Sequence, residues 1–101
     1  MLGLRYLAVA GGSMAPGLRD GDWILARTVP AGEVQVGGVV VVEHPQQPGM
    51  LLVKRVAEVR PDGFWVLGDA PGASTDSRHF GPVPAVLGRV VWRVRPWGRV
   101  R

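Results

Sequence analysis

The sequence predicts a small all-β protein, a barrel or sandwich of five or six short strands with long loops. Fifteen glycines and nine prolines divide the 101 residues into short segments, and valine is abundant between them. Valine favours strands, Gly and Pro mark turns, and no segment repeats its apolar residues with a helical period. Because 47% of the residues are apolar, we expect residues 1–101 to form a single domain with one core.

The first two expected strands lie in the N-terminal half. Residues 23–27 follow the Gly21-Asp22 turn, and residues 39–43 contain four consecutive valines, a pattern typical of a buried strand. We assign no element to residues 1–10. This mildly apolar segment is interrupted by Arg5, is far shorter than the ~20 residues of a membrane span, and lacks the layout of a secretory signal. We therefore expect a soluble chain.

The next two expected strands form a hairpin. Residues 50–59 form one strand and residues 64–67 its partner, and the intervening Arg-Pro-Asp-Gly is a tight-turn sequence. A loop over residues 68–84 follows, and loops of this length are usually functional. In it, Asp76 and Arg78 are spaced to form a two-bond ion pair that fixes the turn. The last strand is expected over residues 86–94.

Metal sites are not expected. The absence of cysteine excludes disulfides and Cys-based metal sites. His44 and His79 lack the spacing of a metal motif, and we interpret both as surface or loop residues. We therefore expect neither a metal nor another cofactor.

The C-terminal residues 89–101 concentrate arginine, the source of the net charge of +4, together with two tryptophans. Arginine with aromatic residues suits nucleic acid or an anionic membrane. The alternation of Val and Arg instead favours an edge strand with Val inside and Arg outside. We favour the edge strand and expect no nucleic-acid partner, and the sequence leaves membrane contact and oligomeric state open.

Lys54 is the only lysine beside eleven arginines, and it lies in an apolar run over residues 51–56. Arginine stays protonated, whereas burial disfavours the charged form of lysine and lowers its pKa. A lysine near neutrality can act as a general base and then as a general acid for a leaving amine. The alternative is a strand lysine with its head in water.

Ser13 lies in a Gly-rich turn and is a candidate nucleophile. A serine hydroxyl needs a base to remove its proton, and Lys54 is a better candidate than His44 or His79 because neither histidine lies in a constrained segment. Gly11 and Gly12 allow a substrate carbonyl to approach the backbone, where the amide of Ser13 can stabilise an oxyanion. The alternative is an ordinary surface turn.

Three segments resemble, in order, the sequence boxes of type I signal peptidases. Residues 13–22 (Ser-Met-Ala-Pro-Gly-Leu-Arg-Asp-Gly-Asp) resemble the box Ser-Met-x-Pro-Thr-Leu-x-x-Gly-Asp. Residues 53–56 (Val-Lys-Arg-Val) resemble the Lys-Arg box, and residues 68–84 resemble the box Gly-Asp-Asn…Ser-x-Asp-Ser-Arg-x-x-Gly-x-Val. The resemblance covers residues 11 to about 90, and the three boxes together are far more specific than one.

The resemblance implies a serine endopeptidase with an all-β core and its catalytic loops on one face. It implies that Ser13 is the nucleophile and Lys54 the general base. Further residues matched by the resemblance are Ser74, which orients the lysine, Asp76 and Arg78, a structural pair near the site, and Met14 and Pro16, which shape the loop of the nucleophile.

The chain departs from the family pattern at several positions. Gly17 stands where Thr is usual, Ala70 where Asn is usual, and Gly11 where some members carry a serine that helps the oxyanion hole. We also expect no N-terminal membrane anchor and no accessory β-domain of the kind found in larger enzymes. In size the chain most resembles the short nickel-type superoxide dismutase maturation proteases.

We therefore expect a cytoplasmic protease that removes an N-terminal leader or propeptide from a precursor protein, with nickel superoxide dismutase as the candidate precursor. One alternative is a membrane-anchored type I signal peptidase that cleaves secretory signal peptides, with its anchor missing from this sequence; it would then be membrane-associated. A self-cleaving repressor-type peptidase also uses Ser and Lys, but it matches residues 68–83 poorly. The alternative of another class is a non-catalytic basic β-domain that binds anionic surfaces.

Overall fold

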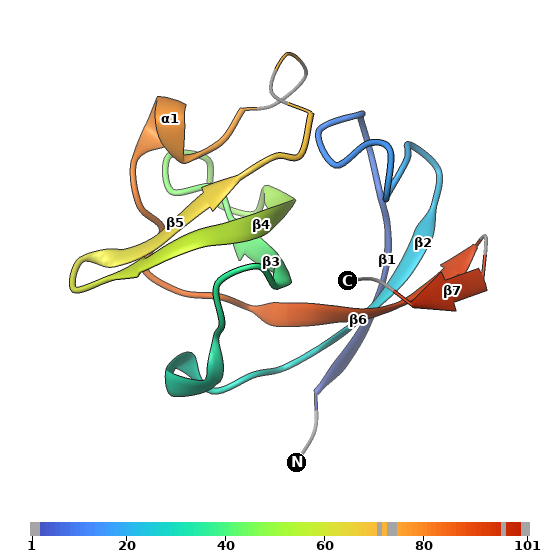
Figure 1. Cartoon of the computed structure of the whole chain (residues 1–101), viewed down its shortest axis with the longest axis horizontal. Helices are drawn as coiled ribbons and strands as arrows, with labels where there is room; N and C mark the ends of the chain where they lie inside the picture. Colours follow the sequence, from blue (N-terminus) through green and yellow to red (C-terminus); the bar gives the residue numbers. More distant parts are fainter. Residues whose placement is uncertain (1–2, 71, 73–74, 96, 100–101) are drawn as a thin grey trace.

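The computed structural model describes residues 3–70, 72, 75–95 and 97–99, and in this part the chain forms one antiparallel sheet (Figure 1). The strand order is β1-β2-β6-β3-β4-β5, with β7 paired on β6. The strands are β1 (Leu4–Ala8), β2 (Trp23–Arg27), β3 (Val39–Glu43), β4 (Leu51–Arg60), β5 (Gly63–Leu67), β6 (Gly88–Arg95) and β7 (Trp97–Arg99), and the helices are the 3-10 turn η1 (Ala31–Glu33) and α1 (Ser77–Phe80).

The sheet curls into a half-barrel. Strands β3, β4 and β5 lie together on one side, β1, β2 and β7 lie on the other, and β6 connects them by pairing with both β2 and β3 (Figure 1). The first and last strands of the order, β1 and β5, are not neighbours. The prediction of an all-β fold with short strands is confirmed.

The core explains the run of valines in β3. Val39 and Val41 belong to one buried cluster, with Ile24 of β2, and Val40 and Val42 belong to a second cluster on the other face. A central strand covered on both faces needs apolar side chains at every position instead of at alternate ones. The remaining members of the second cluster are Val56, Phe64, Val66 and Val83.

The boundaries of β2 and β3 agree with the predicted strands, whereas β1 was not predicted. β1 pairs with all of β2, from Leu4 opposite Arg27 to Ala8 opposite Trp23. Its outward residues are apolar as well as its inward Leu7, so the period-two pattern that announces a strand is missing. The short elements α1 and β7 were also not predicted.

His44, which we interpret from the sequence as a surface or loop residue, does lie in a loop but is not at the surface. His44 follows β3 and is buried, with its ring packed against Phe80 at 4.8 Å between centroids. Its Nδ1 accepts a hydrogen bond from the backbone amide of Gln46 at 3.1 Å, which closes the turn after β3. A polar ring can be buried there because the turn supplies a donor.

Two loops meet at one end of the sheet (Figure 1). Residues 9–22, here called the Ser13 loop, connect β1 to β2, and residues 68–87 connect β5 to β6. The amide of Ala70 donates a hydrogen bond of 2.9 Å to the carbonyl of Ser13, which joins the two loops. Within the described residues, no helix has the length and apolar character that crossing a membrane requires.

Candidate active site

The Ser13 loop is closed at its base by backbone hydrogen bonds. The amide of Val9 donates to the carbonyl of Asp22 at 2.7 Å, and the amide of Gly21 donates back to Val9 at 2.8 Å. Gly11 has φ of 81°, a left-handed conformation that favours glycine, and its amide donates to Asp20 Oδ1 at 2.8 Å. These hydrogen bonds therefore fix the base of the loop that carries Ser13.

Two buried side chains hold the middle of the Ser13 loop against the core. Met14 and Leu18 are both buried in the cluster that contains Ile24, and the amide of Leu18 donates to the carbonyl of Met14 at 3.0 Å. Pro16 lies between them on the exposed side of the loop. Ser13, directly before Met14, is half-buried at the edge of this packed turn.

Ser13 and Lys54 line the same pocket, whose volume is about 130 Å³. Ser13 comes from the Ser13 loop, and Lys54 comes from β4, so two of the three sequence boxes meet there. Most of the lining residues are apolar, which agrees with the desolvation of the lysine by burial. The other lining residues are Leu7, Ala8, Val9, Ala10, Met14, Val41, Leu51, Leu52 and Val53.

Lys54, the only lysine of the chain, is only 3% exposed. It lies opposite Val40 in the β3–β4 register, within an apolar part of the sheet. Desolvation by burial lowers the pKa of Lys54 below its ordinary value, the charge of Asp76 opposes this shift, and the charge of Arg78 adds to it. The neutral amine that a general base requires is therefore more abundant than in an exposed lysine.

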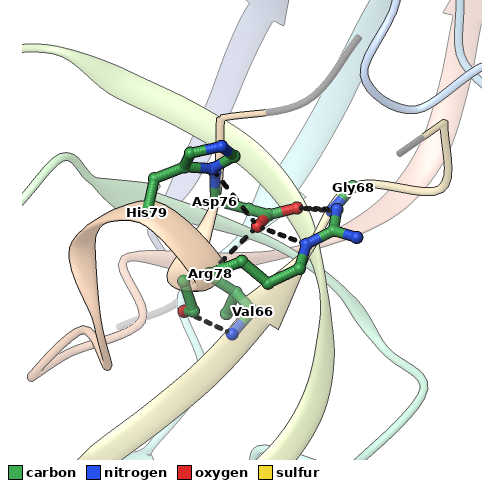
Figure 2. A network of polar contacts seen from close by, with 6 residues as sticks. Val66, Gly68, Asp76, Arg78 and His79 are labelled. Carbon is green, nitrogen blue, oxygen red and sulfur yellow. Dashed lines mark hydrogen bonds and ion pairs between the residues drawn. The ribbon is translucent and has the colours of Figure 1, made fainter. Parts of the chain in front are cut away.

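Asp76 is fully buried and is surrounded by donors (Figure 2). Its Oδ2 accepts from the Gly68 amide at 3.0 Å and from Arg78 Nη2 at 2.6 Å. Its Oδ1 accepts from the amide and the Nε of Arg78, at 3.1 and 3.0 Å. The expected two-bond pair of Asp76 and Arg78 is present, and it keeps a negative charge buried on the side of Lys54.

Asp76 also begins helix α1, a feature that sequence analysis missed. The Asp76 carboxylate accepts from the first turn, and the amide of Asp76 donates to His79 Nδ1 at 3.3 Å, so the two residues form a capping box. Ser77, which is buried, accepts a 2.8 Å hydrogen bond from the Val66 amide through its Oγ. These bonds attach the loop after β5 to β5 itself.

A second ion pair in the site was also missed. Arg55 Nε and Nη2 donate to Asp69 Oδ1 and Oδ2 at 2.9 and 2.8 Å, and Arg55 Nη1 donates to the Gly37 carbonyl at 2.7 Å. The bond to Asp69 raises the pKa of Arg55. Both residues lie in the boxes that resemble signal peptidases, so the resemblance could have singled them out as residues, although not as a pair.

The structure brings some of the predicted site residues together and leaves others apart. Ser13, Met14 and Lys54 line one pocket, and Asp76 acts on Lys54 by charge. Pro16 is exposed on the Ser13 loop and does not line the pocket. Ser74 lies outside the described residues, so its role as the lysine-orienting residue stays a prediction, as does the oxyanion role of the Ser13 amide.

Residues 2–63, more than half of the chain, match the family model for signal peptidase, peptidase S26. The chain belongs to the S26 signal peptidase family. It is therefore a serine peptidase of signal-peptidase type, as the three sequence boxes predicted.

Its curated relatives in this S26 family include mitochondrial proteases. The chain is 36% identical to the mitochondrial ATP-independent inner membrane protease subunit 1a of Arabidopsis thaliana, over 87% of this chain and 68% of the relative. It is 35% identical to the mitochondrial inner membrane protease subunit 2 of Danio rerio, over 96% of this chain and 69% of the relative. Subunit 1b of the Arabidopsis thaliana protease is 33% identical, over 93% and 72%.

These S26 relatives correct the expected location. We predicted a cytoplasmic protein from the short N-terminal segment, but the relatives named above are inner membrane proteases, which point to membrane association. The prediction of a cytoplasmic location is therefore wrong. The physical basis of this prediction was weak. The apolar segment near the chain end describes only one stretch of sequence, and whether a folded domain binds a membrane depends on its whole surface.

Proposed function

We propose that this S26 peptidase uses Ser13 as nucleophile and Lys54 as general base to remove an N-terminal leader from a precursor protein. The observation that carries the proposal is the pocket shared by Ser13 and Lys54, in which burial lowers the pKa of the lysine. Arginine at position 54 would stay protonated, so the one lysine of the chain has a chemical reason to be there.

The reaction follows from the two groups. The neutral Lys54 amine takes the proton of Ser13 Oγ, which forms a bond to the substrate carbonyl carbon and places negative charge on the carbonyl oxygen. Collapse breaks the C–N bond, and the Lys54 ammonium gives its proton to the leaving amine. Water, deprotonated by Lys54, then hydrolyses the Ser13 ester. The Ser13 amide is proposed as an oxyanion donor and Ser74 as the residue that orients Lys54.

The dyad is tested with Ser13→Ala and Lys54→Arg, assayed on a peptide that spans a leader cleavage site. Both variants are expected to lose cleavage by a factor of about 10³ or more, because nucleophile and base act as one unit. Glu58→Gln, an exposed change on the same strand as Lys54, serves as the control and is expected to retain activity. Cleavage by folded Ser13→Ala or Lys54→Arg at the wild-type rate would contradict the dyad.

The identity of the precursor is tested separately. Nickel superoxide dismutase with its leader is the first candidate, from the sequence resemblance, and a membrane-bound precursor is the second, from the names of the relatives. Each is co-expressed with the wild type and with Ser13→Ala, and the product is weighed intact. Removal of the leader that depends on Ser13 identifies the precursor, and an unprocessed product excludes it.

We also propose that the enzyme works at a membrane surface, and exposed residues of β1 favour this setting. Leu4 is 59% exposed and Tyr6 is 54% exposed, and the ring of Tyr6 stacks on Trp23 at 4.8 Å. In the register of β1 and β2, Leu4 lies opposite Arg27. Aromatic and apolar side chains beside arginine suit an anionic lipid interface.

Co-sedimentation with vesicles tests this surface. The wild type is expected to bind phosphatidylglycerol vesicles, and the double change Leu4→Ser and Tyr6→Ser is expected to weaken binding about a hundredfold, since each of the two buried apolar side chains contributes about 1.5 kcal/mol. Val59→Ser, at a similarly exposed apolar residue of β4, is the control. Equal binding by the double variant and the control would contradict the proposal.

A further inference from the structure

Arg93 reaches from β6 to the Ser13 loop. Its Nη1 donates a hydrogen bond of 3.0 Å to the carbonyl of Gly17, across 76 positions of sequence. The alternation of Val and Arg predicts that the C-terminal arginines lie on an outward, solvated face. Arg93 instead lies opposite the buried Ile24 in the register of β2 and β6, and it is half-buried. It is therefore aimed at the same end of the sheet as the pocket.

The bond to Gly17 is the second hydrogen bond that residues outside the Ser13 loop make to the loop backbone in the segment 13–17. At one end of the segment 13–17, the carbonyl of Ser13 is held by the Ala70 amide at 2.9 Å. At the other end, the carbonyl of Gly17 is held by Arg93. Met14 and Leu18 fix the inward side of this segment in the core. The outward side has no comparable packing, because Pro16 and Gly17 are exposed.

Gly17 is the position at which such an anchor has the largest effect. Glycine has no side chain to pack and the widest choice of backbone conformation, so an exposed Gly17 would otherwise be the least restrained residue of the segment. An arginine donor makes a charge-assisted hydrogen bond, which is about twice as strong as a neutral one. A long guanidinium side chain can reach the loop from the neighbouring strand.

We propose that Arg93 is a positioning residue that holds the Ser13 loop in the conformation that presents Ser13 to Lys54. The inference rests on the proposed Ser13–Lys54 function for its catalytic consequence. Arg93 acts through Gly17. It is not among the groups whose charge shifts the pKa of Lys54. Displacing a nucleophile by about 1 Å can lower the rate by a factor of about 10², whereas substrate binding depends on it much less.

The test compares Arg93→Gln and Arg93→Lys with Arg89→Gln, which removes the same charge from an exposed position of β6. For Arg93→Gln we expect kcat to fall by about tenfold or more, with KM within about twofold of the wild type. The pH at which kcat is half-maximal is expected to stay unchanged. Arg93→Lys is expected to recover part of kcat, and Arg89→Gln to retain all of it.

Amide hydrogen exchange supplies a second measurement that does not need activity. Without substrate, residues 14–18 of Arg93→Gln are expected to exchange faster than those of the wild type and of Arg89→Gln. If the wild type shows no cleavage that depends on Ser13, the proposed function fails, while the exchange still decides whether Arg93 anchors the loop.

Several results would overturn the proposal. They are wild-type kcat or wild-type exchange in folded Arg93→Gln, an equal loss in Arg89→Gln, or a change confined to KM or to the pH profile. The last of these would indicate an electrostatic or binding role. If Arg93→Gln does not fold, Arg93→Lys decides: a lower kcat with faster exchange supports the proposal, and wild-type values overturn it.

Discussion

Arg55 and Asp69 form a two-bond ion pair that joins the strand of Lys54 to the loop after β5, which in turn contacts Ser13. The bonds measure 2.9 and 2.8 Å. Arg55 directly follows Lys54, and Asp69 directly precedes Ala70, whose amide binds the carbonyl of Ser13. The position of Ser13 relative to Lys54 is therefore set through two contacts, the Arg55–Asp69 pair and the Ala70–Ser13 hydrogen bond, and a change at either should alter catalysis.

The first prediction concerns Asp69→Asn, which removes the charge and one acceptor of the pair. The side chains of Arg55 and Asp69 are 33% and 28% exposed, so the cost in stability is expected to be small, about 1 kcal/mol or less. The cost in kcat is expected to be larger, about tenfold, because Ser13 loses its fixed distance from the base. Chemical denaturation and steady-state kinetics measure the two effects.

Glu58→Gln is a matched control for this change. It removes the other ion pair of β4, in which Arg60 Nη2 binds Glu58 Oε2 at 2.9 Å, at the end of the strand away from Lys54. It is expected to leave kcat unchanged. The same loss of kcat in both variants, or none in Asp69→Asn, would contradict a specific role for the Arg55–Asp69 pair.

The second prediction concerns pH. Because Lys54 must be neutral to accept a proton and its pKa lies below 10.5, kcat is expected to rise with pH through this lowered pKa. Arg78→Gln removes a positive charge that lowers the pKa of Lys54 and leaves Asp76 less neutralised, so the pKa should rise. The rising limb of the kcat–pH profile is expected to move to higher pH.

Arg60→Gln is the control for the pH profile, since Arg60 packs on the ring of Trp65 at 4.2 Å and is not among the groups that shift Lys54. A limb that moves to lower pH in Arg78→Gln, or that moves equally in the control, would show that the observed titration does not belong to Lys54.

How much of the structure can be predicted from the sequence depends on how far apart along the chain the residues that form each feature lie. The valines of β3 predict a buried strand because each residue carries the signal itself. β1 cannot be predicted in this way, because exposed Leu4 and Tyr6 interrupt the alternation. Its pairing with β2 exists only once the intervening Ser13 loop has closed.

The same distinction applies to the site. Ser13 and Lys54 can be selected by their chemistry, and the Asp76–Arg78 pair by its spacing of two residues. Arg55 and Asp69 are 14 residues apart, and Arg93 and Gly17 are 76 apart. Nothing in the local sequence indicates such pairs, because they form only when the strands assemble. Ser74 lies outside the described residues, so its role stays a prediction.

The third prediction concerns Asp76→Ala. This change leaves the buried amide of Gly68 without its acceptor and removes the cap of α1. We expect the free energy of unfolding to fall by about 2–3 kcal/mol, as is usual when buried donors lose their partner. Asp62→Ala, at an exposed turn position, is the control, and urea denaturation measures both. A loss of less than about 0.5 kcal/mol, the range of ordinary surface changes, would contradict the structural role.

The fourth prediction is that Lys54 lowers the stability of the fold that it serves. Because its pKa is lowered on folding, the unfolded chain binds more protons between that lowered pKa and 10.5, so the wild type becomes more stable as pH rises through this window.

Lys54→Met keeps a long side chain without the charge. At neutral pH it is expected to abolish cleavage and to raise the free energy of unfolding by about 1 kcal/mol, as is common when a buried functional group is replaced. The gain should shrink as pH approaches 10.5, where the lysine of the unfolded chain is also losing its proton. Denaturation of both proteins at several pH values measures it, and a Lys54→Met protein that is less stable than the wild type at neutral pH would show that the ammonium is stabilised in the pocket.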